Sequence, residues 1–228
     1  MLALGFPAAA FGTNCYVLAP AAGEECVVVD PGVGVEGPLV DLLQRYRLRP
    51  AAVLLTHGHL DHVYAVTPVC GGYGIAATVH GADRHRLVDP VGGLGPALAA
   101  ALAAEFGPLR WQEPDDVVTV EDGASLDVAG LAVRVVHAPG HTEGSVLFLV
   151  ERPGEADLCL AGDVLFAGSI GRTDLPGGDH GAMLRSLRER VLPLDDAVEV
   201  LPGHGPATTI GVERRTNPYL RALVGGSG

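Results

Sequence analysis

The segment 56–62 places four metal-binding side chains within six consecutive positions, directly after the apolar run 51–55. These four are His57, His59, Asp61 and His62. A neutral imidazole binds zinc-like ions through one ring nitrogen, and a carboxylate supplies a harder oxygen ligand. At the His-x-His spacing two rings reach one ion, while Asp61 and His62 face a second. The segment therefore predicts a two-metal hydrolase.

Three further candidates stand where an apolar, strand-like run ends, or between two such runs. They are His141, Asp163 and His204, and each has a glycine or proline beside it. Loops that leave strand ends along one rim of a sheet converge, and the sheet fixes their spacing. Any one of these residues alone would be weak evidence. Four separate loops with the same arrangement indicate a metal centre.

The elements that must position these side chains are short β-branched strands mixed with Ala- and Leu-rich helices. Strands are expected in the opening segment and at 15–18, 26–30, 53–56, 77–80, 117–120, 131–136, 145–150, 158–161 and 198–201. Helices are expected at 37–46, 61–68, 96–106, 180–191 and near 217–224. Hairpin-like turns around Gly123 and Gly130 favour a layered α/β sandwich over a doubly wound parallel sheet.

The length of 228 residues suits one domain that spans 1–228. The Gly/Pro-rich segment 89–96 is compatible with a plain surface loop or with a lid. The opening residues lack a basic stretch, and Gly5 and Pro7 interrupt their apolar run, so a first strand is favoured over a signal peptide. No apolar run approaches the roughly 20 residues of a membrane span.

Charge and cysteine content limit the possible partners and the compartment. The net charge is −12, and the 15 basic residues, all arginine, form no cluster, which disfavours nucleic acid as a partner. The four cysteines form no Cys-x-x-Cys pair, and three lie in apolar runs, as reduced core thiols of a cytoplasmic protein do.

Four motifs together resemble those of the metallo-β-lactamase superfamily, and within it the glyoxalase II-like (hydroxyacylglutathione hydrolase-like) hydrolases. The motifs are T-H-G-H-L-D-H, P-G-H-T-E-G-S, A-G-D-V-L-F and P-G-H-G. The resemblance implies a four-layer αββα sandwich with metals at one edge. It also implies a first ion held by His57, His59 and His141, a second held by Asp61, His62 and His204, and Asp163 bridging both. Common dizinc β-lactamases carry Cys at the position of Asp163, which argues against β-lactamase activity.

The resemblance implies a thioesterase that cleaves S-acyl or S-hydroxyacyl thioesters of a small thiol by a metal-bound hydroxide. Two divalent ions are expected, zinc first, with iron or manganese also compatible. Asp61 would in addition orient the hydroxide. A small-molecule thioester is the only partner expected, with no nucleic acid and no membrane.

Substrate recognition is less well defined than the metal centre. Arg172 occupies the place of a basic residue that binds the thiol's carboxylate in glyoxalase II, but it could instead pair with Asp174. Asp174 and Pro206 stand where the family has aromatic residues, which leaves the thiol open. Alternatives are a persulfide dioxygenase, with one iron held by His57, His141 and Asp163, and a lactonase or phosphodiesterase of the same superfamily.

Overall fold

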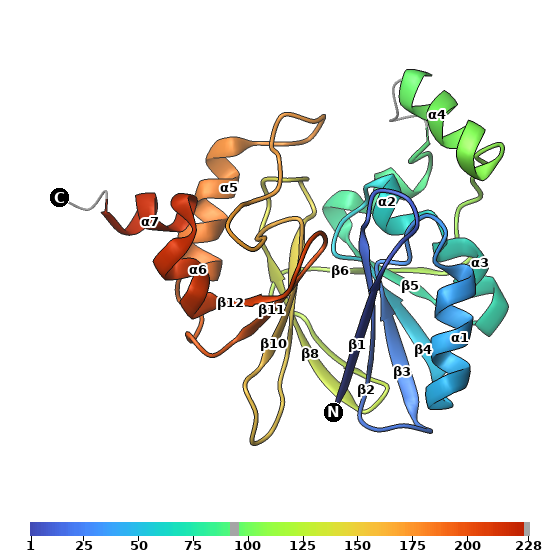
Figure 1. The fold of residues 1–228 in the computed structure, drawn as a ribbon, viewed down its shortest axis with the longest axis horizontal. Helices are drawn as coiled ribbons and strands as arrows, with labels where there is room; N and C mark the ends of the chain where they lie inside the picture. Colours follow the sequence, from blue (N-terminus) through green and yellow to red (C-terminus); the bar gives the residue numbers. More distant parts are fainter. Residues whose placement is uncertain (92–95, 226–228) are drawn as a thin grey trace.

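The first half of the chain forms a mixed sheet whose strand order follows the sequence, from β1 to β6 (Figure 1). The computed structural model describes residues 1–91 and 96–225. The strands of this sheet are β1 (Leu2–Pro7), β2 (Asn14–Ala19), β3 (Glu25–Val29), β4 (Arg49–Leu54), β5 (Ala77–His80) and β6 (Val117–Val120). β1 to β3 are antiparallel neighbours, whereas β3 to β6 run parallel. The carboxyl ends of β3, β4 and β5 therefore meet at one edge.

The second half forms a sheet in the order β12-β11-β10-β9-β8-β7. Its strands are β7 (Ser125–Val128), β8 (Leu131–His137), β9 (Val146–Val150), β10 (Leu158–Gly162), β11 (Glu199–Pro202) and β12 (Thr208–Thr209). All neighbours in this sheet are antiparallel except β10 and β11, which run parallel. β10 and β11 therefore end at the same edge and deliver the loops that follow them to one place.

Apolar side chains fill three interfaces, and these define four layers. Between the two sheets, Leu18 and Val27 share a core cluster with Phe148 and Leu160. Helices α1 (Glu36–Tyr46) and α3 (Val66–Tyr73) cover the outer face of the first sheet. The outer face of the second is covered by α5 (His180–Ser186), a π-helical extension (Leu187–Val191), α6 (Ile210–Thr216) and α7 (Pro218–Gly225). The predicted αββα sandwich is confirmed.

The two glycine turns used in the prediction have different outcomes. Around Gly130 the hairpin is confirmed, because β7 and β8 pair across Ala129 and Gly130, whose φ angles are 51° and 69°. Two central residues with positive φ suit a tight hairpin turn. The prediction of a hairpin at Gly123 was wrong, since β6 belongs to the first sheet and β7 to the second. The chain crosses between the sheets there.

Several element boundaries also differ from the prediction. The helix expected at 61–68 is two helices, α2 (Leu60–Val63) and α3, and α6 was not predicted. The opening strand is confirmed as β1. Of the segment 89–96, residues 92–95 lie outside the described residues, so neither interpretation of it is tested. All four cysteines are buried and unpaired, as expected for core thiols.

Helix α4 (Pro96–Phe106) stands apart from the layers, at the end of the molecule where α2 lies (Figure 1). Its Leu102 packs into a small cluster with Ala10, Val33 and Leu60. Among the described residues, no helix is long and apolar enough to cross a membrane.

Candidate metal centre

The first four candidate ligands follow the carboxyl end of β4: His57 and His59 lie in the loop that leads into α2, and the other two lie in α2 itself. His59 precedes the first turn of α2, so Asp61 and His62 project from that turn. His57 and His62 are buried. A Cβ on Gly32 would lie 2.0 Å from the carbonyl oxygen of Asp61, so only glycine lets the β3–α1 loop pack against α2 here.

The other three candidates come from the second sheet. His141 lies in the connection between β8 and β9, Asp163 directly follows β10, and His204 follows β11. The two strand-end loops are joined by a hydrogen bond from the Gly203 amide to the Gly162 carbonyl. A Cβ on Gly203 would lie 2.2 Å from Asp163 Oδ1, so the missing side chain leaves room for that carboxylate.

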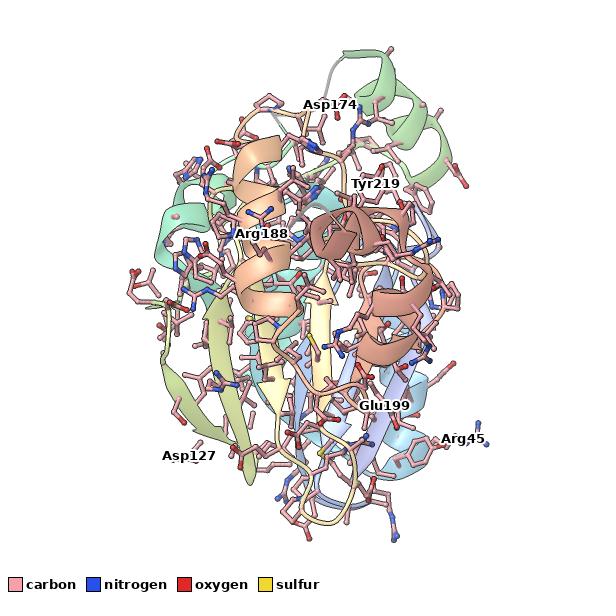
Figure 2. All side chains as sticks on the ribbon, turned by 90° about the vertical axis from the view of Figure 1, so that its left-hand side faces the viewer. Arg45, Asp127, Asp174, Arg188, Glu199 and Tyr219 are labelled. Carbon is pink, nitrogen blue, oxygen red and sulfur yellow. The ribbon has the colours of Figure 1, made fainter. Side chains whose placement is uncertain are left out.

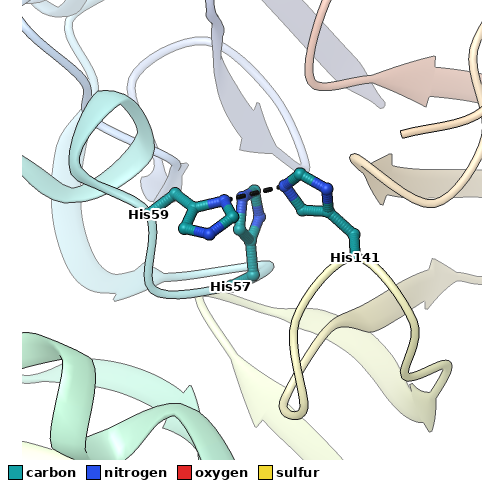
Figure 3. Close-up of side chains that lie close together, drawn as sticks. All are labelled: His57, His59 and His141. Carbon is teal, nitrogen blue, oxygen red and sulfur yellow. Dashed lines mark hydrogen bonds between the residues drawn. The ribbon is translucent and has the colours of Figure 1, made fainter. Parts of the chain in front are cut away.

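The structure brings all seven predicted ligands together. In each of three groups, the possible ligand atoms lie within 4.8 Å of one another: His57, His59 and His141; His57, His62 and Asp163; Asp61, His62 and His204. Figure 3 shows the first group, in which His59 Nδ1 and His141 Nε2 are 2.8 Å apart. Each group takes two residues from the 57–62 segment and one from the second sheet.

Asp163 lies between the first and the third of these groups. Its Oδ2 is 3.4 Å from His141 Nε2 and 3.7 Å from His204 Nε2, and its Oδ1 is 3.4 Å from His62 Nε2. Asp61 Oδ2 is 3.5 Å from His62 Nε2 and 3.2 Å from His204 Nε2. The Asp163 carboxylate therefore faces both the first and the third group, whereas Asp61 belongs to the third group.

The donor atoms themselves show that this arrangement fits cations. Within the described part of the chain, three buried atoms of the cluster have no hydrogen-bond partner: His57 Nε2, His62 Nε2 and Asp163 Oδ1. A buried polar atom without a partner costs about 1–3 kcal/mol. Imidazole nitrogens and carboxylate oxygens are ligands of zinc and similar ions, and coordination would satisfy all three atoms. The cluster could therefore hold a divalent metal.

Charge states also favour metal binding at two of the histidines. Burial, together with the neighbouring imidazoles of His62 and His141, holds the pKa of His57 well below its usual range. Burial and His141 lower the pKa of His59 to about 3. A neutral imidazole is the form that binds metal, so these two rings compete little with protons.

The carboxylates of the cluster remain ionised. Burial alone would raise the pKa of Asp61, but nearby His62 and hydrogen bonds from His204 and Thr13 hold it well below its usual range. Asp163 shows the same balance, with burial opposed by His62, and its pKa is also lowered. In the reverse sense, Asp61 and Asp163 outweigh burial and raise the pKa of His62. The negative charge of Asp61 and Asp163 thus favours a cation at this place, and it is the same charge that raises the pKa of His62.

Asp30 fixes the orientation of His62. Its carboxylate accepts hydrogen bonds from the Thr56 amide at 2.8 Å, from Thr56 Oγ1 at 2.6 Å and from His62 Nδ1 at 2.9 Å. His62 Nε2 is therefore left to face the cluster, as in other carboxylate–histidine–metal arrangements. Asp30 is not among the site residues predicted from the sequence.

Asp83 connects the two halves of the site and was missed in the sequence. It is fully buried in the 3₁₀-helix Gly81–Leu87. Its carboxylate accepts hydrogen bonds from the Gly58 amide at 2.8 Å, Thr142 Oγ1 at 2.7 Å and the Gly144 amide at 2.8 Å. One side chain thereby holds the loop of His57 and His59 against the loop of His141.

A cleft of about 800 Å³ opens above the cluster. His59, Asp61, His141, Asp163 and His204 line its floor. Its walls are largely apolar and include Phe11, Leu98, Phe166, Ile170 and Leu175. The predicted substrate residue Arg172 lines the cleft as well. The backbone carbonyl of Arg172 lies 2.8 Å from His141 Nδ1, so this residue also orients a candidate ligand.

The sequence profile of the metallo-beta-lactamase superfamily matches residues 8–204, the stretch that contains all seven clustered residues. The chain belongs to the metallo-beta-lactamase superfamily. The resemblance inferred from the four motifs is thereby confirmed, and the two sheets with their flanking helices have the fold of this superfamily.

Two relatives match most of the chain. An uncharacterized protein of Mycobacterium tuberculosis is 48% identical and covers 98% of this chain and 99% of its own. The hydroxyacylglutathione hydrolase GloC of Haemophilus influenzae is 34% identical over 81% of this chain and 82% of its own.

Two crystal structures match the fold at higher sequence identity than GloC. The BLEG-1 B3 metallo-beta-lactamase has a TM-score of 0.79 and 38% identity, and covers 96% of this chain and 99% of its own. TTHA1623, solved in a di-iron-bound form, has a TM-score of 0.76 and 37% identity, and covers 95% of this chain and 100% of its own. One of these relatives is named a hydroxyacylglutathione hydrolase and another a B3 metallo-beta-lactamase, so the family alone does not define the substrate.

Proposed function

We propose that this chain is a two-metal hydrolase that cleaves thioesters of a small thiol. The observation that carries the proposal is the position of Asp163 between two groups of ligands, beside buried donor atoms that have no partner in the described residues. The choice of a thioester follows the match to a hydroxyacylglutathione hydrolase over most of both chains.

We assign His57, His59 and His141 to one ion, Asp61, His62 and His204 to the second, and Asp163 to both. Bound there, two divalent cations would lower the pKa of a water molecule and polarise a carbonyl oxygen. Zinc is our first choice because histidine and carboxylate donors suit it. Iron is the second, since a relative with 37% identity was solved with two irons.

Asp61 is the residue we propose to orient the attacking water. It lies on the floor of the cleft, and Thr13 Oγ1 donates a hydrogen bond of 2.8 Å to its Oδ2. Because its pKa is depressed, the carboxylate accepts hydrogen bonds and does not donate them at neutral pH. A thiolate leaves without help from a strong acid, since free thiols have a pKa of about 8.5.

A substrate panel tests this function on protein of measured metal content. S-lactoyl thioesters of several thiols, a lactone series and nitrocefin are compared before chelation, after chelation and after metal is restored. We expect metal-dependent thioester hydrolysis that exceeds the other activities. Equal thioester turnover by the chelated protein would contradict the proposal. Faster turnover of nitrocefin or lactones would redirect it, and nitrocefin matters because a 38% identical structure is a B3 metallo-beta-lactamase.

Oxygen uptake separates the proposal from its redox alternative. A persulfide dioxygenase would need only one iron, held by His57, His141 and Asp163. The third ligand group, Asp61 with His62 and His204, has no function in that scheme, although its possible ligand atoms also lie within 4.8 Å of one another. We expect no oxygen consumption with a glutathione persulfide, and consumption coupled to one bound iron would favour the dioxygenase.

A further inference from the structure

The permanent cations that line the described part of the cleft, Arg86 and Arg172, are both engaged by other protein groups. Arg172 donates from Nε to Asp174 Oδ1 at 2.7 Å and from Nη2 to Asp174 Oδ2 at 2.8 Å. Such a two-point contact uses the Nε/Nη2 edge of the guanidinium, one of the two edges that bind a carboxylate, and neutralises the charge of the arginine.

Arg86 is held from three sides. Its Nη2 donates to Glu143 Oε2 and to the Pro176 carbonyl, and its Nε lies 3.3 Å from Asp83 Oδ1. Only 15% of its side chain is exposed. The Arg86 guanidinium therefore serves to join the loops around the site, and Asp83 and Glu143 already balance its charge.

Outside the proposed metal ligands, the rest of the described cleft is largely apolar. Phe11, Leu98 and Leu175 are among the residues that form its walls. Glutathione carries two carboxylates and one ammonium group, so its thioesters are net anions at neutral pH. An anion gains little in a cleft where the arginines are already paired.

We propose that the substrate is a thioester of an uncharged thiol, and that Asp174 determines this specificity by occupying the Arg172 guanidinium. This inference rests on the proposed thioesterase activity and specifies its substrate class. Asp174 acts through Arg172 and does not line the cleft itself, so it is a positioning residue. Figure 2 shows it at the same end of the molecule as α4.

Two variants of Asp174 test the proposal. Asp174→Asn removes the charge with little change of shape, and Asp174→Ala removes the two-point contact. The substrates are the S-lactoyl thioesters of glutathione and of N-acetylcysteamine, which is uncharged. We expect the ratio of kcat/KM for glutathione over N-acetylcysteamine to rise about two- to fivefold, the size of one exposed ion pair. The rise should come from a lower KM, and it should shrink as salt is added.

Glu199→Gln is the matched control. Glu199 is also an exposed carboxylate paired with an arginine, with Oε1 3.1 Å from Arg152 Nη2, and it lies near the opposite end of the molecule (Figure 2). This variant changes the net charge as Asp174→Asn does, and we expect the ratio to stay within its experimental error. Metal content is measured in each protein, because the Arg172 backbone contacts His141.

Arg172→Ala tests whether the Arg172 guanidinium binds an anionic substrate in the natural protein. We expect its KM for the glutathione thioester to stay within about twofold, and the double variant Arg172→Ala/Asp174→Asn to lose the gain of Asp174→Asn. A several-fold rise in KM from Arg172→Ala alone would overturn the inference, as would equal ratios for Asp174→Asn and Glu199→Gln. If neither thioester is hydrolysed by metal-loaded protein, the proposed function itself fails.

Discussion

The floor and the walls of the cleft are built in different ways. On the floor, buried donors are held by further hydrogen bonds: Asp30 orients His62, and Asp83 joins the loops of His57 and His141. On the walls, Leu98 is 43% exposed, and the Arg172 side chain is paired with Asp174, which is itself exposed. The metal-binding residues on the floor are thus held rigidly, whereas side chains on the walls can be substituted without moving them.

The largest effect is expected from Asp163→Ala, which removes the carboxylate between the two ligand groups. Because these donors act as one unit, we expect at least about a thousandfold loss of turnover and less bound metal. Metal analysis and steady-state kinetics measure both. Asp127→Ala is the control, since Asp127 is exposed at the far end of the second sheet (Figure 2). If Asp163→Ala still bound two ions per chain and kept full activity, the assignment of Asp163 as a ligand of both ions would be contradicted.

An intermediate effect is expected from Asp83→Asn, in the layer beneath the ligands. The Gly58 and Gly144 amides donate to different oxygens of Asp83, and an amide side chain keeps only one acceptor oxygen, so one of these two donors loses its partner. We expect a 10- to 100-fold loss in metal affinity or activity, typical of groups that orient ligands. Competition with a coloured chelator measures the affinity. Unchanged affinity would show that the loops do not need this support.

The smallest effect is expected on the walls, from Leu98→Ser. Leu98 is partly exposed, so its loss removes only part of the roughly 0.8 kcal/mol per buried methylene. We expect KM to rise about two- to fourfold for a long-chain acyl thioester and to stay constant for an acetyl one. Val40→Ser is the control, because Val40 is 41% exposed on α1, outside the cleft. The same rise in KM in both variants would show that Leu98 does not contact the substrate.

The sequence revealed the floor because its donors stand in short motifs at strand ends. His57 and His62 are five positions apart in one loop, and His141, Asp163 and His204 each follow the same pattern of apolar run, glycine and donor. The layered fold could be inferred for a similar reason, since strands buried on both faces are apolar throughout, as β9 is.

The supporting contacts could not be found in the sequence because they join distant positions. Asp83 contacts residues 25, 59 and 61 positions away, and its own segment carries no recognisable motif. The turn at Gly123 shows a related limit, since a local turn signal does not say whether the next strand joins the same sheet. The pairing of Arg172 with Asp174 was one of two alternatives, and it needed coordinates for a decision.

Every ligand group takes two members from the segment 57–62 and a third from beyond the crossover into the second sheet. Neither half of the sandwich then supplies one of these ligand groups by itself. A cation at this edge would link the two halves of the sandwich. Its removal should therefore weaken the contact between the halves more than the packing within either half. A chain emerging from the ribosome would complete the group of Asp61, His62 and His204 only after position 204, so the second ion would be bound late in assembly.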